Sequence, residues 1–451
     1  MSTVAHKPST AVIAGLGRTG LACARYLREH GWRLAVTDTR TDPPQLEPLR
    51  ALDPDIVVRL GGLDPQLLDE AVCVLASPGL PLDLPFFAEA RRRGLEIFGD
   101  IELFARAASA PVAAITGTNG KSTVTTLLGR MAARAGLLVR VGGNLGEPAL
   151  DLLAAAERCA RPTDLYVLEL SSFQLDTTES LDLKAAAVLN VSADHLDRYA
   201  SVEDYALSKA RVFARCDTAV VNLDDALVAR MTRRGQRVLG FSVAGAAGAA
   251  YTVLQREGAW LARHGEPLLP VAQMRLRGLH NAANALAALA LGEALELPRA
   301  AMLAELREFT GLPHRTQWVA EVRGVTYIDD SKGTNVGATL AAIRGMDGTL
   351  VLIAGGEGKN QDFAPLAAAL RGKARHVVLI GRDAEPIARA LEGVCTSEVC
   401  ASMPAAVAAA ARAAAPGDTV LLSPACASLD MFRDYAHRGE SFAQAVRELP
   451  A

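Results

Sequence analysis

The sequence reads Gly117-Thr118-Asn119-Gly120-Lys121-Ser122-Thr123 between an apolar run, Val112 to Thr116, and a helical pattern that continues to about Ala135. A glycine-rich turn between a strand and a helix presents backbone N–H groups and the positive end of the helix to phosphate oxygens. In such a turn Lys121 would reach the outer phosphates, and the Ser122 hydroxyl would bind Mg²⁺. The general P-loop pattern has glycine at the position of Ile115, so only the shorter form is present. The stretch predicts a nucleotide-binding α/β domain rather than a chance turn.

About 110 residues precede this turn, and they alternate strand and helix signals. The first strand runs into Gly15-Leu16-Gly17-Arg18-Thr19-Gly20, and Asp38 follows the next strand. This is the spacing of a dinucleotide-binding turn and its ribose-binding acid, which alone predicts NAD and a dehydrogenase. The turn requires only close approach of the backbone to a diphosphate, so any nucleoside diphosphate could use it.

Strand and helix signals also alternate after the P-loop segment. Short antiparallel strands are expected around 250–269, and two Ala/Leu-rich helices are expected at 280–295 and 299–309. Gly311-Leu312-Pro313 then interrupts the helical pattern. The expected fold is α/β with three domains: a Rossmann-like domain at 1–99, a P-loop ATPase-type domain at 100–311, and a Rossmann-like domain at 312–451.

The composition narrows the class of protein. The chain has 451 residues, 50% of them hydrophobic, and a formal net charge of −3. This balance argues against a basic nucleic-acid surface. No apolar run reaches the roughly 18–20 residues that span a bilayer, and the polar N-terminus lacks the apolar core of a signal peptide. The seven cysteines are scattered singly, as in reduced proteins, so we expect a cytoplasmic location.

Lysine is scarce, which makes each lysine informative. Only seven of the 47 basic residues are lysines, so a retained lysine can mark a position that needs a compact amine. Lys121, Lys332 and Lys359 each fall in a predicted turn between a strand and a helix, where an anion can bind. Lys209 stands four residues after Tyr205 on a helix that the pattern predicts from about Val202 to Arg215, so the two share a face.

Acidic and imidazole groups are expected at the carboxyl ends of two strands, where open α/β sheets place their sites. Glu169 ends one strand and offers the hard oxygen that Mg²⁺ prefers. His195 lies in Asp194-His195-Leu196-Asp197-Arg198-Tyr199, after a second strand. A histidine would be an atypical Mg²⁺ ligand, and a structural role for it stays open. Ser423 to Asp430 follows the last strand, and its hydroxyl and N–H groups could hold a carboxylate.

Together these segments resemble the Mur ligase family, and the branch that adds D-glutamate most closely. The resemblance covers about Thr10 to Leu449. It rests on these segments: G-T-N-G-K-S-T (117–123), G-G-N-L-G (142–146), L-E-L-S-S-F-Q-L (168–175), N-V-S-A-D-H-L-D-R-Y (190–199), H-N-A-A-N-A-L-A-A (280–288), G-L-P-H-R (311–315), D-D-S-K-G-T-N (329–335), G-G-E-G-K (355–359) and L-S-P-A-C-A-S-L-D (422–430).

The resemblance implies two substrates, UDP-N-acetylmuramoyl-L-alanine and D-glutamate, besides ATP. The uridine diphosphate would lie against Arg18, Thr19, Asp38, Thr39, Arg40 and Gly79. The reacting end of that substrate would contact Asn144 and Ser171. D-glutamate would be held by Thr334, Lys359, Ser428, Leu429 and Tyr435. ATP would contact Gly117, Thr118, Asn119, Gly120, Lys121, Ser122, Thr123, Asn284, Arg315, Asp330 and Lys332.

The resemblance also implies two Mg²⁺ ions and a modified lysine. Ser122 and Glu169 would hold one ion, whereas His195 and a Lys209 carbamate, formed from CO₂, would serve the second. Lys121, His195 and Lys209 would be the catalytic residues. The implied reaction transfers the γ-phosphoryl group of ATP to a carboxylate, and the amine of D-glutamate then displaces phosphate through a tetrahedral intermediate. The family also implies a monomer.

Four alternatives remain. An NAD-dependent dehydrogenase would explain the first glycine-rich turn but not the P-loop or the lysine-bearing loops. Folylpolyglutamate synthase shares the ATP site and reaction, but it needs no uridine-binding domain before the P-loop. Another Mur ligase would keep the fold and change the amino acid. A non-catalytic nucleotide-binding module would leave Glu169, His195 and Lys209 unused.

Overall fold

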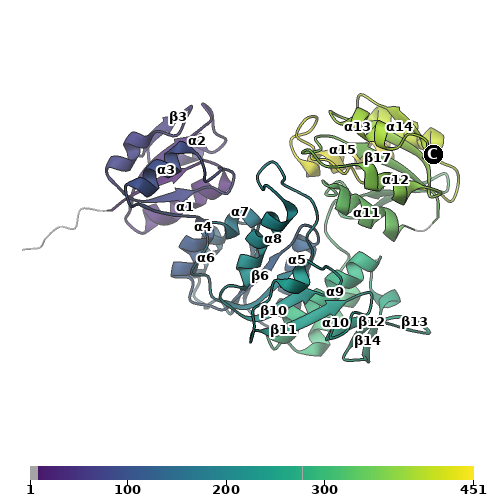
Figure 1. Cartoon of the computed structure of the whole chain (residues 1–451), viewed down its shortest axis with the longest axis horizontal. Helices are drawn as coiled ribbons and strands as arrows, with labels where there is room; N and C mark the ends of the chain where they lie inside the picture. The colour runs from purple at the N-terminus through teal and green to yellow at the C-terminus, as the bar shows by residue number, and fades with distance from the viewer. Residues whose placement is uncertain (1–8, 277, 347, 451) are drawn as a thin grey trace, which may run out of the picture.

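The computed structural model describes residues 9–276, 278–346 and 348–450, and it contains three β-sheets flanked by helices. Figure 1 shows three bodies, with the N-terminal and C-terminal domains on either side above the central domain. The α/β class and the three-domain organisation expected from the sequence are confirmed. The expectation about the N-terminal residues falls mostly outside the described residues, which begin at Ser9.

The first sheet has five parallel strands in the order β3-β2-β1-β4-β5. β1 and β4 are buried over most of their lengths, as expected for central strands of a parallel sheet covered on both faces. The strands are β1 (Thr10–Ala14), β2 (Arg33–Asp38), β3 (Val57–Leu60), β4 (Ala71–Ala76) and β5 (Glu96–Phe98). The helices are α1 (Arg18–Glu29), α2 (Leu46–Leu52) and α3 (Pro85–Arg92).

The central sheet has nine strands in the order β14-β13-β12-β11-β10-β9-β6-β8-β7. β12, β13 and β14 pair antiparallel, which confirms the expectation for residues 250–269. The strands are β6 (Val112–Thr116), β7 (Val139–Gly143), β8 (Leu165–Glu169), β9 (Leu183–Val188), β10 (Cys216–Asn222), β11 (Arg237–Ser242), β12 (Tyr251–Arg256), β13 (Gly258–Arg263) and β14 (Glu266–Pro270).

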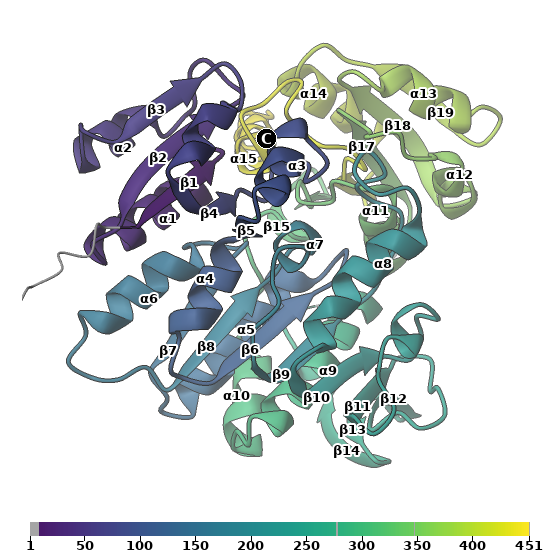
Figure 2. The ribbon, with the colours of Figure 1, turned by 60° about the vertical axis from the view of Figure 1, so that its left-hand side comes forward.

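Helices cover both faces of the central sheet (Figure 2). One apolar core joins α5 and α9 to the sheet, and another joins α4 and α6 to it and continues into the N-terminal domain. The helices are α4 (Asp100–Ala107), α5 (Lys121–Arg134), α6 (Ala149–Glu157), α7 (Ser172–Leu175), α8 (Val202–Ala210), α9 (Leu279–Ala294) and α10 (Arg299–Glu308). The shared core fixes the N-terminal domain against the central one.

The third sheet has six strands in the order β15-β16-β20-β17-β18-β19, and only β15 runs antiparallel to its neighbour. The strands are β15 (Gln317–Val322), β16 (Val325–Asp329), β17 (Leu350–Gly355), β18 (Ala374–Ile380), β19 (Thr396–Val399) and β20 (Thr419–Leu422). The helices are α11 (Val336–Gly345), α12 (Ala364–Leu370), α13 (Ala384–Ala390), α14 (Met403–Ala413) and α15 (Tyr435–Arg447).

One helix is shorter than the sequence predicted. The pattern favoured a helix from Val202 to Arg215, but α8 ends at Ala210 and a 3₁₀ turn follows at Arg211–Phe213. The Arg211 guanidinium donates to the backbone oxygens of Leu175 and Thr178, which ties this turn to α7. The chain can therefore reverse into β10, which begins at Cys216.

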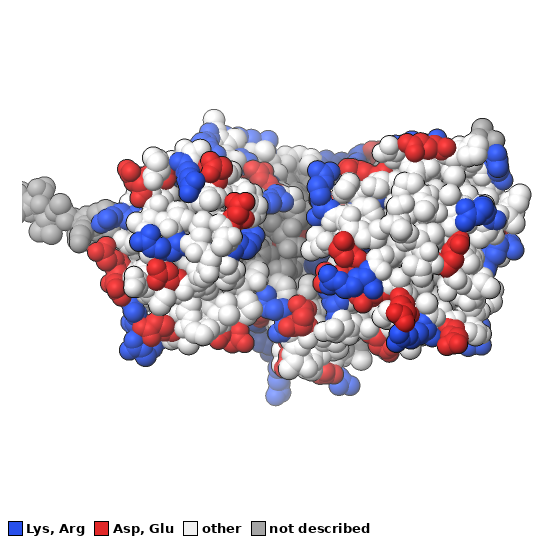
Figure 3. All heavy atoms as spheres, turned by 90° about the horizontal axis from the view of Figure 1, so that it is seen from above, with Lys and Arg blue, Asp and Glu red and all other residues white. Residues whose placement is uncertain are grey.

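Three global features follow from the structure. No helix among the described residues is long and apolar enough to cross a membrane. All seven cysteines are free thiols. Figure 3 shows basic and acidic side chains interspersed over one face, with a hollow between the N-terminal and C-terminal domains.

Candidate active site

The glycine-rich turn after β6 has the strained backbone that glycine permits. Gly117 and Gly120 have φ of 147° and 83°, conformations that other residues rarely adopt. A Cβ atom at Gly120 would lie 2.4 Å from Asn284 Oδ1, so the turn also sits too close to α9 for a side chain. The Lys121 amine donates to the backbone oxygens of Gly117 and Thr118, at 2.8 Å each. The side chain of Lys121, the first residue of α5, therefore holds the turn together through these two hydrogen bonds.

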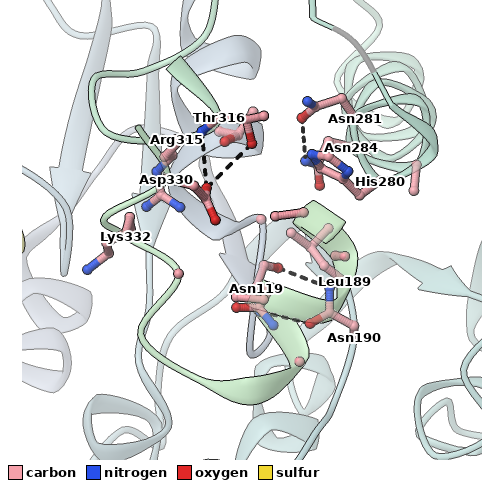
Figure 4. Close-up of a pocket in the computed structure, with 18 of the residues that line it drawn as sticks. Asn119, Leu189, Asn190, His280, Asn281, Asn284, Arg315, Thr316, Asp330 and Lys332 are labelled. Atoms are coloured by element: carbon pink, nitrogen blue, oxygen red, sulfur yellow. Dashed lines mark hydrogen bonds between the residues drawn. The ribbon is translucent and has the colours of Figure 1, made fainter. Parts of the chain in front are cut away.

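A cavity of about 340 Å³ opens beside this turn, between the central and C-terminal domains. Figure 4 shows α9 on one side of it and the segment with Arg315, Asp330 and Lys332 on the other. Of the residues predicted for ATP, the cavity is lined by Asn119, Gly120, Thr123, Asn284, Arg315, Asp330 and Lys332. The rest of that group, Gly117, Thr118, Lys121 and Ser122, lies in the adjoining turn and first residues of α5.

Burial shifts the ionisation of the charged groups in this cavity. The Arg315 guanidinium donates to Ser122 Oγ at 2.7 Å, and burial lowers the pKa of Arg315. Asp330 accepts from Ser423 Oγ at 2.7 Å, and burial raises its pKa to about 7. Burial, together with the charges of Arg315 and Lys121, lowers the pKa of Lys332 to about 8. Basic groups held in this way are poised to receive an anion.

Glu169, at the end of β8, is 3% exposed. Its Oε1 accepts from the Asn144 side-chain amide at 2.6 Å, whereas its Oε2 is buried without a hydrogen-bond partner. A buried carboxylate oxygen without a donor is costly unless something else satisfies it. The orphaned oxygen is therefore available to a cation.

Lys209 and His195 both lie beside the Tyr205 ring. The Lys209 amine is 4.2 Å from the centre of that ring and donates to Gly117 O at 3.0 Å. Lys209 is 1% exposed, and burial lowers its pKa well below the usual value, with a further contribution from Lys121. The His195 ring is 6.1 Å from that of Tyr205, and burial lowers its pKa as well.

The predicted metal residues do not form a conventional acidic cluster. No group of three His, Cys, Asp or Glu side chains among the described residues is arranged to hold a metal ion. The predicted set contains only two such residues, Glu169 and His195, beside Ser122 and Lys209. A second site would therefore depend on a ligand that unmodified lysine does not supply.

The C-terminal domain contacts the central one through Asp194. Its Oδ1 lies 3.5 Å from the Lys359 amine, and its Oδ2 accepts from the Asn335 side-chain amide at 3.2 Å. Burial opposes ionisation of Asp194, but Lys359 and other cations outweigh it, so the pKa is lowered. Asn335, which caps α11, also contacts Asn119 of the P-loop turn. These contacts join the amino end of α11 to the nucleotide turn.

Three of the five residues predicted for D-glutamate, Lys359, Ser428 and Leu429, lie in two neighbouring loops. A bridge between Glu357 and Ala427 sets the loop of Lys359 beside that of Ser428. The ring of Tyr435 lies 4.0 Å from the Lys332 amine, next to the cavity beside the P-loop turn. Leu429 is 68% exposed, and the backbone N–H of Thr334 donates to Lys332 O at 2.8 Å. The described structure thus groups these residues by loop and not in one cavity.

A second cavity, of about 460 Å³, lies in the N-terminal domain at its border with the central domain. It is lined by the predicted residues Arg18, Thr19, Asp38, Thr39, Arg40, Gly79 and Asn144. Ser171 is placed next to it, since its backbone N–H donates to the side-chain oxygen of Gln174, which lines the cavity. The structure therefore brings residues from two domains to one pocket.

Asp38 is not arranged like the ribose-binding acid of a dehydrogenase. Its carboxylate accepts from the Leu16 backbone N–H at 2.6 Å and from the Arg40 side chain at 2.9 and 2.7 Å. Burial alone would raise the pKa of Asp38, but these donors lower it. A carboxylate engaged in this way has little capacity left for both hydroxyls of a ribose, which weighs against the NAD alternative.

Three family models match successive parts of the chain. Residues 9–99 match "Mur ligase MurD-like, N-terminal domain", residues 115–292 match "Mur ligase middle domain", and residues 314–426 match "Mur ligase, glutamate ligase domain". The chain belongs to the Mur ligase family. Enzymes of this family depend on ATP.

Curated Mur ligases resemble the chain over its whole length. A UDP-N-acetylmuramoylalanine–D-glutamate ligase of Nitrosococcus oceani is 52% identical, with 98% of this chain and 97% of the relative covered. The enzyme of the same name from Pseudomonas aeruginosa is 50% identical, with 97% and 98% covered.

Solved Mur ligase structures share the fold at lower identity. A pseudomurein peptide ligase type C from Methanothermus fervidus has a TM-score of 0.64 at 18% identity, covering 98% of this chain and all of that one. UDP-N-acetylmuramate–alanine ligase from Thermotoga maritima has a TM-score of 0.62 at 18% identity, covering 97% and 99%.

Several residues of the Mur ligase site were not predicted individually. His280, Asn281 and Asn190 line the cavity beside the P-loop turn, Gln174 lines the second cavity, and Asn335 joins the domains. All of them lie inside segments that carried the family resemblance, so the sequence marked their neighbourhoods. It gave no signal for their contacts, which depend on segments distant in the chain.

Proposed function

We propose that this Mur ligase joins D-glutamate to the L-alanine carboxylate of UDP-N-acetylmuramoyl-L-alanine, with ATP converted to ADP and phosphate. The observation that carries the proposal is the full-length similarity, at about half identity, to enzymes of that name. The two cavities support it. One adjoins the P-loop turn, and the other combines a diphosphate-type turn with residues of the central domain.

The chemistry needs an activated carboxylate, because a carboxylate has no good leaving group. Transfer of the γ-phosphoryl group gives an acyl phosphate, and attack by the amine of D-glutamate gives a tetrahedral intermediate that expels phosphate. Lys121, at the start of α5, would neutralise charge on the transferring group. Lys332 and Arg315, from the opposite wall of the cavity, would add two further cations. The acyl phosphate must be kept from water, which the apposed C-terminal domain would do.

Mg²⁺ fits the residues present in two places. Glu169 offers a buried oxygen without a partner, and Ser122 is the second residue of α5, next to the P-loop turn. His195 and Lys209, which both lie beside the Tyr205 ring, would serve a second ion once Lys209 carries a carbamate. When bound, the ions supply charge neutralisation for phosphoryl transfer.

Lys209 is suited to carbamylation because only a neutral amine captures CO₂. Burial holds its pKa well below the usual value, so the amine is neutral more often than that of an exposed lysine. Capture forms an N–C bond, releases a proton and leaves an anionic group with two oxygens. That group would give His195 an oxygen partner at the second ion. An arginine could not react in this way, in keeping with lysine at this position.

The remaining assignments extend the same proposal. The uridine diphosphate would occupy the cavity at Arg18, Thr19, Asp38, Thr39, Arg40 and Gly79, with Asn144 and Ser171 toward the reacting end. D-glutamate would be held by Thr334, Lys359, Ser428, Leu429 and Tyr435. ATP would bind the P-loop turn together with Asn284, Arg315, Asp330 and Lys332. We further propose a cytoplasmic monomer with domains at 1–99, 100–311 and 312–451.

One experiment tests the reaction and its specificity. Phosphate release is measured with ATP, Mg²⁺ and UDP-N-acetylmuramoyl-L-alanine, with D-glutamate, L-glutamate, L-lysine or meso-diaminopimelate added in turn. Release that requires D-glutamate is the expected result. Release with another amino acid would keep the Mur ligase mechanism and overturn the assigned amino-acid site. Absence of release with all four would refute the proposed reaction, and folates and nicotinamide cofactors would then be tested.

A further inference from the structure

The turn that carries His195 also carries an arginine that reaches into the N-terminal domain. Arg198 Nη1 donates to Gly79 O at 3.2 Å, and Nη2 donates to Leu80 O at 3.1 Å. Both carbonyls belong to the segment after β4, which forms part of the wall of the second cavity. Arg198 itself belongs to the central domain. One side chain therefore joins the turn of His195 to the wall of the proposed uridine diphosphate site.

The backbone of Arg198 is joined to His195 by hydrogen bonds within a tight turn. The backbone N–H groups of Arg198 and Tyr199 both donate to His195 O, at 2.9 and 3.1 Å. His195 has a φ of 55°, so the turn is tight as well as closed by hydrogen bonds. A displacement of Arg198 would thus be transmitted to the imidazole.

An aromatic ring holds the guanidinium in place. The Arg198 guanidinium carbon lies 4.5 Å from the centre of the Phe173 ring. The same ring stacks on Tyr199 at 5.7 Å, and it meets His195 edge-on at 4.9 Å. Phe173 lies in α7, next to Gln174, which lines the cavity. The Phe173 ring therefore contacts both Arg198 and His195, and the residue that follows Phe173 in the chain lines the cavity.

The chemistry of this contact requires arginine. A planar guanidinium can donate to two successive carbonyls while its face stacks on a ring, whereas a lysine amine offers a point charge and no flat face. No carboxylate within 4.0 Å pairs with Arg198 in the described part of the chain, so its contacts are directional hydrogen bonds and stacking and not an ion pair.

We propose that Arg198 is a positioning residue that sets the distance between the uridine diphosphate cavity and the reacting centre at His195. The inference rests on the proposed function. A substrate held at its nucleotide end must deliver its carboxylate about one substrate length away. The two ends can act together only if the cavity wall and the His195 turn keep a fixed separation. Arg198 supplies that constraint, and a misplacement of about 1 Å at a reacting centre can lower a rate about 100-fold.

The test compares two arginines that join the same two domains. Arg25, on α1, pairs with Asp151 of α6 at 2.7 Å, and neither residue lines the cavity. R198Q, R198K and R25Q are made in the full-length protein. For each variant, UDP binding is measured by calorimetry, kcat and KM are measured for all three substrates, and thermal stability is recorded.

The expected result separates binding from turnover. R198Q should lower kcat about 10- to 100-fold, while the Kd for UDP and the KM for ATP stay within about threefold of wild type. R198K should fall between R198Q and wild type, because it can restore one donor. R25Q should keep wild-type kcat, even if both glutamine variants lose similar thermal stability.

Three results would overturn the inference. Equal kcat values for R198Q and R25Q would show that Arg198 does not position the turn. If R198Q lost UDP binding by as large a factor as kcat, Arg198 would only support the wall of the cavity and would not position the His195 turn. If R198Q does not fold, R198K becomes the test. A wild-type kcat in R198K would then show that Arg198 does not position the turn. Failure of the wild-type protein itself to bind UDP or turn over would instead refute the proposed function.

Discussion

Gly120→Ala tests the geometry of the P-loop turn, because the structure offers a control with matching backbone. Gly120 and Gly136, just before and just after α5, have φ of 83° and 93°. A Cβ at Gly136 would meet nothing within 4 Å, whereas a Cβ at Gly120 would lie 2.4 Å from Asn284 Oδ1. The two substitutions therefore share the conformational cost and differ only in the steric clash.

The magnitudes follow from these contacts. A non-glycine residue in the left-handed region costs about 1–2 kcal/mol. Both variants should therefore lose this amount from the free energy of unfolding. Only Gly120→Ala must also move Asn284, which is buried and donates to Asn281 Oδ1 at 3.2 Å. Loss of that hydrogen bond adds about 1 kcal/mol or more. We expect a total loss of about 2–4 kcal/mol for Gly120→Ala and about 1–2 kcal/mol for Gly136→Ala.

The assay has two readouts. Urea midpoints, followed by a signal from the central domain, should fall further for Gly120→Ala than for Gly136→Ala. The KM for ATP should rise about tenfold only in Gly120→Ala, because displacement of Asn284 removes about 1.4 kcal/mol of nucleotide binding. Equal urea midpoints and unchanged KM values for ATP in the two variants would show that Gly120 does not pack closely against Asn284 of α9.

Three further predictions concern buried ionisable groups. Lys209→Ala should lower phosphate release at least about 100-fold, and wild-type activity should fall in CO₂-free buffer and return with bicarbonate; full activity of the variant would contradict the carbamate. Glu169→Gln should raise the Mg²⁺ concentration for half-maximal activity at least about tenfold, and an unchanged Mg²⁺ titration would exclude Glu169 as a ligand. Burial raises the pKa of Asp100 from 3.8 to about 6, so the folded state binds the proton more tightly and wild-type stability falls as pH rises through this range. The stability of Asp100→Asn relative to wild type should therefore increase by about 2 kcal/mol between pH 4 and pH 7, and a difference in urea midpoints that does not change with pH would contradict this assignment.

The features predicted well from sequence were those encoded locally. The P-loop turn, its flanking strand and α5 depend on glycine spacing and on a continuous apolar run, and both are visible in a short window. β12 to β14 were also predicted, as antiparallel strands. These elements need no information about distant partners.

Three strands of the structure, β11, β15 and β19, lie where the sequence has no regular apolar alternation. β15 and β19 are at the two edges of the third sheet, and both have mixed or exposed residues. β11 begins with two exposed residues before its buried ones. With one side of the strand open or one end in solvent, the sequence carries no regular apolar pattern to detect.

The contacts of the site depend on pairs that are far apart in the chain. Asn335 and Asp194 are 141 residues apart, and Arg315 and Ser122 are 193 residues apart. Each of these residues lies in a segment that carried the resemblance. Which of them meet was set by the packing of the C-terminal domain against the central one, and no spacing rule in the sequence contains that information.

The cations in and around the cavity beside the P-loop turn disfavour the contact between the central and C-terminal domains. Burial lowers the pKa of Lys121, Lys209, Lys332 and Arg315, which means that each would be more easily charged in water than where it lies. Their mutual repulsion disfavours the closed arrangement unless negative charge is supplied. Glu169 and Asp194 supply part of it from the central domain. A polyphosphate between the walls would supply the rest, so the free energy of nucleotide binding and the closure of the C-terminal domain are coupled through the same cations.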